Sequence, residues 1–138
     1  MTILRTHIEF CSDAFPQTQN EIDQWEGQIW AESLAKYLVE QFNQQGITSD
    51  YCLEDWGCFI ELDNEQYPHI GIGCNRYEDE YKNSFLIFLH PATPTIRKWL
   101  FKKIDISNQL NCMADTIEKI LAQHSEIYNI RWWDEQEK

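Results

Sequence analysis

The stretch Ser84-Phe85-Leu86-Ile87-Phe88-Leu89-His90 decides the fold, because it is the most apolar run in the sequence and has the length of one strand. Apolar side chains on both faces of such a run are typical of a strand in the middle of a sheet. Pro91 and Pro94 end it, since proline lacks the backbone N–H that strand pairing needs. Three earlier segments also have strand character, at 47–53, 56–62 and 67–74. Short polar segments join the strands, so we expect all four to form an antiparallel meander.

Two amphipathic helices and two outer strands flank this meander in the sequence. Residues 28–45 place Trp30, Leu34, Leu38 and Phe42 at intervals of four, which predicts a helix that ends at Gly46. The second helix carries an apolar stripe made of Leu110, Met113, Ala114, Ile117, Ile120, Leu121 and His124. Outer strands are predicted at 7–10 and 127–132, a long loop over 11–27, and a short helix around Ile96, Trp99 and Leu100.

The resulting order, β-α-β-β-β-β-α-β, predicts an α+β protein with two layers and a single domain over residues 1–138. We expect a mostly antiparallel sheet of five to six strands, covered on one face by two long helices, because neither helix can bury its apolar stripe alone. Gly71 and Gly73 fall on one face of their strand, so an aromatic ring, a helix or a ligand should pack closely over them.

The charge of the chain is strongly negative and unevenly distributed. The 138 residues have a formal net charge of −12, which disfavours direct binding of nucleic acid or of an anionic membrane surface. Residues 1–75 carry 13 acidic and two basic residues, whereas residues 76–138 carry 10 and nine. Such a one-sided acidic field can steer a basic partner. The alternative is that it only keeps the protein in solution.

The cysteines and the first residues indicate a cytosolic protein. No apolar run is long enough to cross a membrane, and residues 1–7 lack the features of a signal peptide. The five cysteines are odd in number and include no C-x-x-C pair, so we expect reduced and mostly buried thiols.

No motif in the sequence indicates catalysis or metal binding. The histidines are scattered, no set of cysteines and histidines has zinc spacing, and no G-x-S-x-G occurs. We therefore expect a protein that is not an enzyme and has no metal and no cofactor. Trp132 and Trp133 lie on opposite faces of the last strand, so one ring should be buried and the other exposed.

Acidic and aromatic residues cluster at the predicted strand ends and form the candidate partner-binding surface. Carboxylates supply steering and register against a basic protein, and aromatic rings supply buried anchors. A divalent cation site and a set of merely solvated hairpin tips are the alternative uses of the same residues. The candidate residues are Glu54, Asp55, Asp63, Glu65, Tyr77, Glu78, Asp79, Glu80 and Tyr81.

Four segments carry a resemblance that covers almost the whole chain: residues 51–58, 69–74, 102–105 and 130–133. The chain resembles a family of small acidic bacterial proteins, most of them uncharacterised, with an E-D-W-G element, an I-G-x-G-type strand and a terminal R-W-W. In size, charge and build it is also similar to immunity proteins of contact-dependent inhibition and related toxin systems. This resemblance implies an acidic protein that blocks a toxin, often a basic nuclease, by covering its active site.

The leading hypothesis is a non-catalytic cytosolic immunity or inhibitor protein, which binds a cognate basic toxin domain and is a monomer or weak homodimer when free. One alternative is a small-ligand- or metal-dependent enzyme with a groove over Gly71 and Gly73, lined by His69, Cys74 and Glu54. Another alternative is a structural homodimer that pairs through Trp132 or an edge strand.

Overall fold

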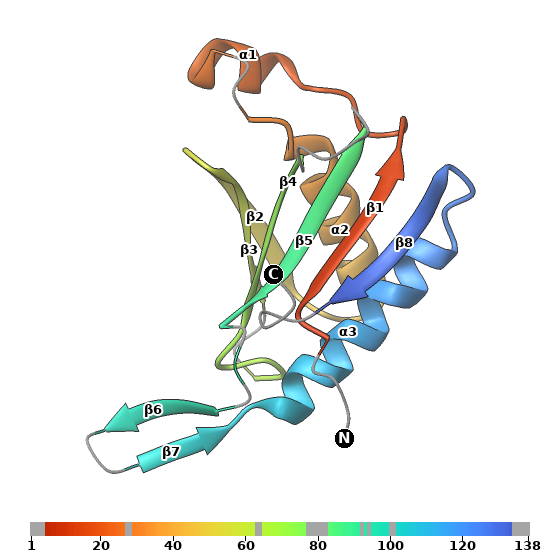
Figure 1. Ribbon diagram of the computed structural model, residues 1–138. Helices are drawn as coiled ribbons and strands as arrows, with labels where there is room; N and C mark the ends of the chain where they lie inside the picture. Colours follow the sequence, from red (N-terminus) through yellow and green to blue (C-terminus); the bar gives the residue numbers. More distant parts are fainter. Residues whose placement is uncertain are drawn as a thin grey trace.

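The computed structural model describes residues 5–26, 29–62, 65–76, 83–91, 93, 95–99 and 102–133. These residues form three helices and eight strands (Figure 1). In chain order the elements are β1 (His7–Ser12), α1 (Gln19–Trp25), α2 (Glu32–Gln44), β2 (Ser49–Glu54), β3 (Gly57–Leu62), β4 (Gly71–Arg76), β5 (Ser84–His90), β6 (Thr95–Trp99), β7 (Lys102–Asp105), α3 (Ser107–Ala122) and β8 (Ile127–Trp133).

The main sheet has six strands in the order β2-β3-β4-β5-β1-β8, and every neighbouring pair is antiparallel. Strands β2 to β5 form the predicted meander, with β5 in the interior of the sheet as its apolar sequence indicated. The first strand of the chain inserts between β5 and β8, so the two outer strands of the sequence lie next to each other in space.

One face of the sheet is buried against the helices. Ile8, Ile60, Ile72 and Ile87 point to this face and are at most 1% exposed. Figure 1 shows α2 and α3 behind the sheet, and their apolar stripes belong to the same buried cluster. Within these helices the stripe residues are buried as their spacing predicted. Trp30 and His124, which the prediction also placed in the stripes, lie outside the helices and are half-buried. Alternation along each strand therefore leaves the other face for polar and aromatic side chains.

The predicted fold, one sheet covered by two long helices, is wrong. The described residues contain three helices, of seven, 13 and 16 residues, and a second sheet made of β6 and β7. The predicted short helix around Ile96 is strand β6, because Ile96 pairs with Ile104 across a hairpin instead of completing a helical stripe. Figure 1 shows this hairpin projecting from one end of the sheet, with α1 beyond the opposite end.

Helix α1 lies where a loop was predicted, and it positions the start of α2. Thr18 and Glu21 form a capping box at the N-terminus of α1. The buried carboxylate of Glu21 also accepts hydrogen bonds from the backbone N–H groups of Ala31, at 2.6 Å, and Glu32, at 3.1 Å. It thus satisfies free N–H groups at the start of α2, where the helix dipole favours negative charge. This explains why α2 begins at Glu32 and not at residue 28 as predicted.

Candidate functional site

One row of cross-strand partners runs across all six strands on the face of the main sheet that points away from α2 and α3, here called the outer face. Directly opposed residues of antiparallel strands lie on the same face, so the strand register defines the row. Its members, from β2 to β8, are Cys52, Phe59, Gly73, Phe88, His7 and Trp133.

Several aromatic rings in this row and beside it contact one another. The ring centroids of His7 and Trp133 are 4.2 Å apart, and those of Trp56 and Phe88 are 5.6 Å apart. His7 and Trp133 are each only 4% exposed, whereas Phe59 and Phe88 are half-buried and Trp56 is 41% exposed. The part of the row that a partner can reach therefore lies over β3, β4 and β5.

Two glycines of β4 make room for these rings. A Cβ atom at Gly71 would collide with the ring of Phe59, and one at Gly73 would collide with the ring of Phe88. The prediction that something packs closely over the glycine face is confirmed, and the group that packs there is an aromatic ring at each position. Glycine is thus required for the rings to lie flat on the sheet.

The E-D-W-G element forms the turn between β2 and β3 and holds Trp56 over the outer face. Gly57 has a φ of +152°, and a Cβ atom there would collide with the backbone of Cys74 and the side chain of Asn75. The side-chain amide of Asn75 donates a hydrogen bond of 2.7 Å to the carbonyl oxygen of Trp56. A residue other than glycine would push the turn away from β4 and lift the indole from Phe88.

Negative charge lies on the β2 side of the accessible part of the row. Asp50 and Glu61 are direct cross-strand partners of β2 and β3, and both side chains are exposed. Glu54 lies at the end of β2 on the same face. Among the ion pairs of the described residues, Arg131 binds Glu9 at 2.7 Å, but none includes Asp50, Glu54 or Glu61. Like charges directly opposed in a sheet destabilise it, so this arrangement has a cost in stability.

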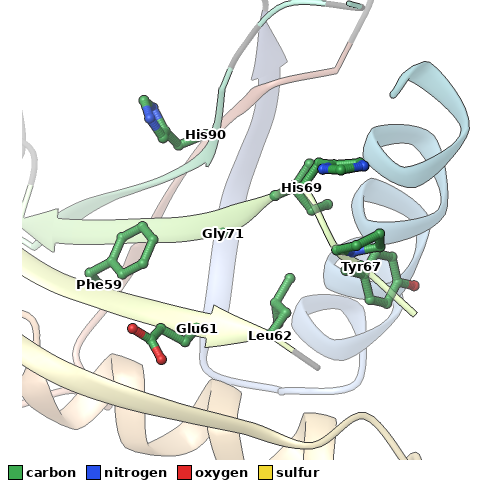
Figure 2. Close-up of a pocket in the computed structure, with 9 residues that line it drawn as sticks. Phe59, Glu61, Leu62, Tyr67, His69, Gly71 and His90 are labelled. Atoms are coloured by element: carbon green, nitrogen blue, oxygen red, sulfur yellow. The ribbon is translucent and has the colours of Figure 1, made fainter. Parts of the chain in front are cut away.

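A second row of cross-strand partners on the outer face lies next to the first and consists of Asp50, Glu61, Gly71 and His90. A hollow of about 410 Å³ lies on this second row. Phe59 and Glu61 reach it from β3, Gly71 from β4 and His90 from β5, while Tyr67 and His69 come from the connection that leads into β4 (Figure 2). Burial raises the pKa of the Tyr67 phenol, so this group stays neutral near pH 7. The hollow thus combines one carboxylate with aromatic and imidazole walls.

The predicted partner-binding residues do not all come together. Glu54 and Asp55 lie side by side at the β2–β3 turn, but Glu65 follows the other end of β3, roughly 20 Å away for a six-residue strand. The expected convergence of the strand tips is therefore wrong for these residues, because successive tips of a meander lie at opposite ends. Six predicted residues lie outside the described part of the chain: Asp63, Tyr77, Glu78, Asp79, Glu80 and Tyr81.

The residues predicted to line a groove over the glycines also separate. His69 and Gly71 line the hollow, but Gly73 is covered by Phe88. Cys74 is fully buried on the opposite face, with its sulfur 4.0 Å from the carbonyl oxygen of Ala31. Glu54 is not among the residues that line the hollow.

The two tryptophans of β8 do not include an exposed ring, contrary to the expectation for one of them. Trp133 stacks on His7 and is buried. Trp132 is half-buried, because the guanidinium of Arg5 lies over its ring at 5.6 Å and its Nε1 donates a 3.1 Å hydrogen bond to Glu118. Trp56, by contrast, is exposed.

The buried titratable groups have structural roles. Burial raises the pKa of the Cys58 thiol to about 12 and raises that of Cys74 well above its ordinary value, so neither forms the thiolate that a nucleophile needs. The carboxylate of Glu32 accepts hydrogen bonds from Thr18 and from Tyr51, at 3.2 Å for the latter. Carboxylates so fully bonded hold the helix and strand together and have no free oxygen aimed at solvent.

Within the described ranges, no three histidine, cysteine or acidic side chains are arranged to hold a metal ion. In the same part of the chain no helix has both the length and the apolar composition to cross a membrane. Comparisons with known protein families, curated proteins and solved structures find no match to this sequence.

The sequence predictions did not include the central residues of the outer face as partner-binding residues. Glu61 was grouped with the acidic residues at the strand ends, whereas Phe59, Phe88 and Asp50 were placed only in predicted strands. The available signal was the alternation of Phe59 and Glu61 with the apolar residues Cys58, Ile60 and Leu62, which marks two faces of one strand. The strand register of β3 with β4, and of β4 with β5, places Phe88 and the glycines beside Phe59. This register is a tertiary feature without a local signal in the sequence.

Proposed function

We propose that this chain is a non-catalytic binding protein that neutralises a basic protein toxin, in the manner of an immunity protein, by covering it with the outer face. The resemblance to immunity proteins and the net charge of −12 favour this class of partner. The outer face supplies the two kinds of group that such an interface uses, aromatic anchors and carboxylates without an ion-pair partner among the described residues.

The observation that carries this proposal is the opposed pair Asp50 and Glu61 beside the aromatic row. Two like charges across a strand pair lower the stability of the free protein. A basic side chain from a partner converts this repulsion into attraction to both carboxylates. Side chains that lower the stability of the free protein but bind a ligand are typical of functional surfaces.

Trp56 is the main anchor of the proposed interface. Its indole is 41% exposed in the free chain and rests against Phe88, so a partner buries a large apolar surface there at little cost in side-chain entropy. Glu54 and Asp55 precede it in the same turn, which places carboxylates next to the anchor. A ring of polar contacts around a buried tryptophan is the usual arrangement of a binding hot spot.

The test first asks whether a secreted protein with a basic C-terminal domain is encoded immediately upstream of this chain's gene, and then measures binding to that domain. We expect Trp56→Ala to raise Kd about 30-fold, the loss typical of a hot-spot residue. The double variant Glu54→Gln/Glu61→Gln should raise Kd about tenfold and mainly slow association, because it removes steering charge. Isothermal titration calorimetry and stopped-flow association measure the two effects.

The matched control is Glu40→Gln/Glu126→Gln, which changes the net charge equally at two exposed positions outside the outer face. It should leave Kd within about twofold, since isolated surface charges contribute little. The proposal would be contradicted if the two double variants raised Kd equally. It would also be contradicted if no basic secreted partner were encoded next to this chain.

A further inference from the structure

The hollow between β3, β4 and β5 holds the groups that recognise one kind of side chain. Glu61 supplies a negative charge at its rim, and that charge has no ion-pair partner among the described residues. Asp50, directly opposite on β2, adds a second negative charge nearby. An anionic ligand would be repelled here, whereas a cation is attracted by both carboxylates.

Planar groups form part of the lining of the hollow. The ring of Phe59 lies over Gly71, His69 lies at the start of β4 and His90 lies on β5 (Figure 2). A guanidinium group stacks on planar rings and at the same time donates two parallel hydrogen bonds to a carboxylate. An ammonium group is not planar and cannot donate two parallel hydrogen bonds in this way, so the hollow favours arginine over lysine.

The hollow has room for one long side chain. Its volume of about 410 Å³ lies at the lower end of the range for ligand pockets in proteins, about 300–1,000 Å³. The hollow opens on the outer face, in the row of residues next to the row of Phe88. The ring of Phe88 packs against Trp56. A protein held by Trp56 can therefore insert a neighbouring side chain into it.

We propose that this hollow is a specific binding site for an arginine side chain of the partner. The inference rests on the proposed function for its biological partner, but the site itself is a property of the free chain. Glu61 pairs with the guanidinium, and Phe59 provides the surface on which it stacks. His69 and His90 line the hollow beside the guanidinium.

The probe is N-acetyl-arginine methylamide, titrated into the uniformly ¹⁵N-labelled full chain and followed by amide chemical shifts. We expect saturable shifts at His69, Ile70 and Gly71, with a Kd of a few millimolar, as for a single side chain in a shallow site. The citrulline analogue has the same shape without the charge and should cause at most a tenth of the shift. The lysine analogue should bind several-fold more weakly than the arginine probe.

Two variants with the same charge change make the site assignment testable. Glu61→Gln should weaken arginine binding at least fivefold, whereas Glu54→Gln, on the same face but outside the hollow, should change it less than twofold. Both side chains lie at the surface, and the amide spectrum of each variant reports whether it is folded. Equal effects of the two variants, or equal shifts with the citrulline analogue, overturn the arginine site.

The arginine site and the proposed function can fail separately. If the probe does not bind but the toxin domain still depends on Glu54 and Glu61, the pocket inference is wrong and the proposed function survives. If the probe binds as expected but substitutions of Glu54 and Glu61 do not change binding of the toxin domain, the site is real and the proposed partner is wrong.

Discussion

At the scale of the residue, Glu32 connects folding to pH. Its side chain is buried at the start of α2. Burial raises the pKa of this carboxyl, but hydrogen bonds from Thr18 and Asn20 and the charge of Lys36 together outweigh burial, so its pKa lies below the ordinary value of 4.5. A carboxyl with a lowered pKa stabilises the folded state at pH values above its unfolded pKa, and the contribution disappears as the pH falls through the folded pKa.

We therefore expect Glu32→Gln to lower the free energy of unfolding by about 1–3 kcal/mol at pH 7, the usual size for hydrogen bonds to a charged group. The difference from the wild type should shrink as the pH is lowered from about 5 through the lowered pKa. Urea unfolding at a series of pH values measures it. Glu40→Gln, exposed on the same helix, should show a small difference at every pH. A Glu32 difference that is constant down to acid pH contradicts this account.

The buried carboxylates are the part of the structure that local sequence patterns indicate least. Thr18-Gln19-Asn20-Glu21 has the form of a capping box, a local signal for the start of α1 that the prediction of a loop over 11–27 did not use. The same Glu21 also binds the start of α2, ten residues later. This second contact depends on how the chain folds back, so the local sequence does not indicate it. Burial of an acidic side chain is rare and becomes favourable only once these donors are in place.

At the scale of the element, β2 and β3 place the carboxylates of Asp50 and Glu61 directly opposite each other, and like charges so opposed destabilise a strand pair. Glu61→Lys removes the repulsion and creates an attraction to Asp50, so we expect it to raise the free energy of unfolding by about 0.5–1 kcal/mol. The gain should decrease in high salt, because both side chains are exposed and screened. Urea unfolding at low and high ionic strength measures both effects.

Glu54→Lys is the control for this strand pair, because Glu54 is opposed by Gly57, which has no side chain. It should change the stability by less than about 0.5 kcal/mol, as expected for a surface substitution away from such pairs. If Glu61→Lys is no more stable than Glu54→Lys, the two opposed carboxylates do not repel each other measurably. The observation that carries the proposed function would then lose its physical basis.

Periodicity located the elements with strong patterns and failed for the short ones. The stripes of α2 and α3 and the apolar run of β5 are long enough to exclude other structures. Around Ile96 the sequence fits one helical turn or a strand equally well, and only the pairing of Ile96 with Ile104 decides it. The separation of Glu65 from Glu54 follows from the meander itself, since its successive turns lie at opposite ends of the sheet.

At the scale of the whole molecule, the charge is arranged by element. Asp50, Glu54 and Glu61 lie on the outer face near the β2 edge of the sheet. Exposed basic side chains lie on the hairpin of β6 and β7, which projects from one end of the sheet (Figure 1). The sequence predicted an acidic first half and a balanced second half, but in the fold the two halves interleave, since β1 lies between β5 and β8. The carboxylates of β2 and β3 and the basic hairpin nevertheless lie apart, so a basic partner should approach the outer face with its positive surface towards β2 and β3.

The two exposed cysteines report this orientation, because Cys52 lies on the outer face beside Phe59 and Cys112 lies on α3, behind the sheet. Burial, followed by a hydrogen bond to Glu54, raises the pKa of the Cys52 thiol, so alkylation with iodoacetamide is best measured at about pH 8.5, where more thiolate is present. With the toxin domain bound, we expect Cys52 to react about tenfold more slowly and Cys112 at an unchanged rate, since only a covered thiolate loses access to the reagent. Mass spectrometry of each peptide measures both rates. Protection of Cys112 without protection of Cys52 would place the partner on the helical side and overturn the assignment of the outer face.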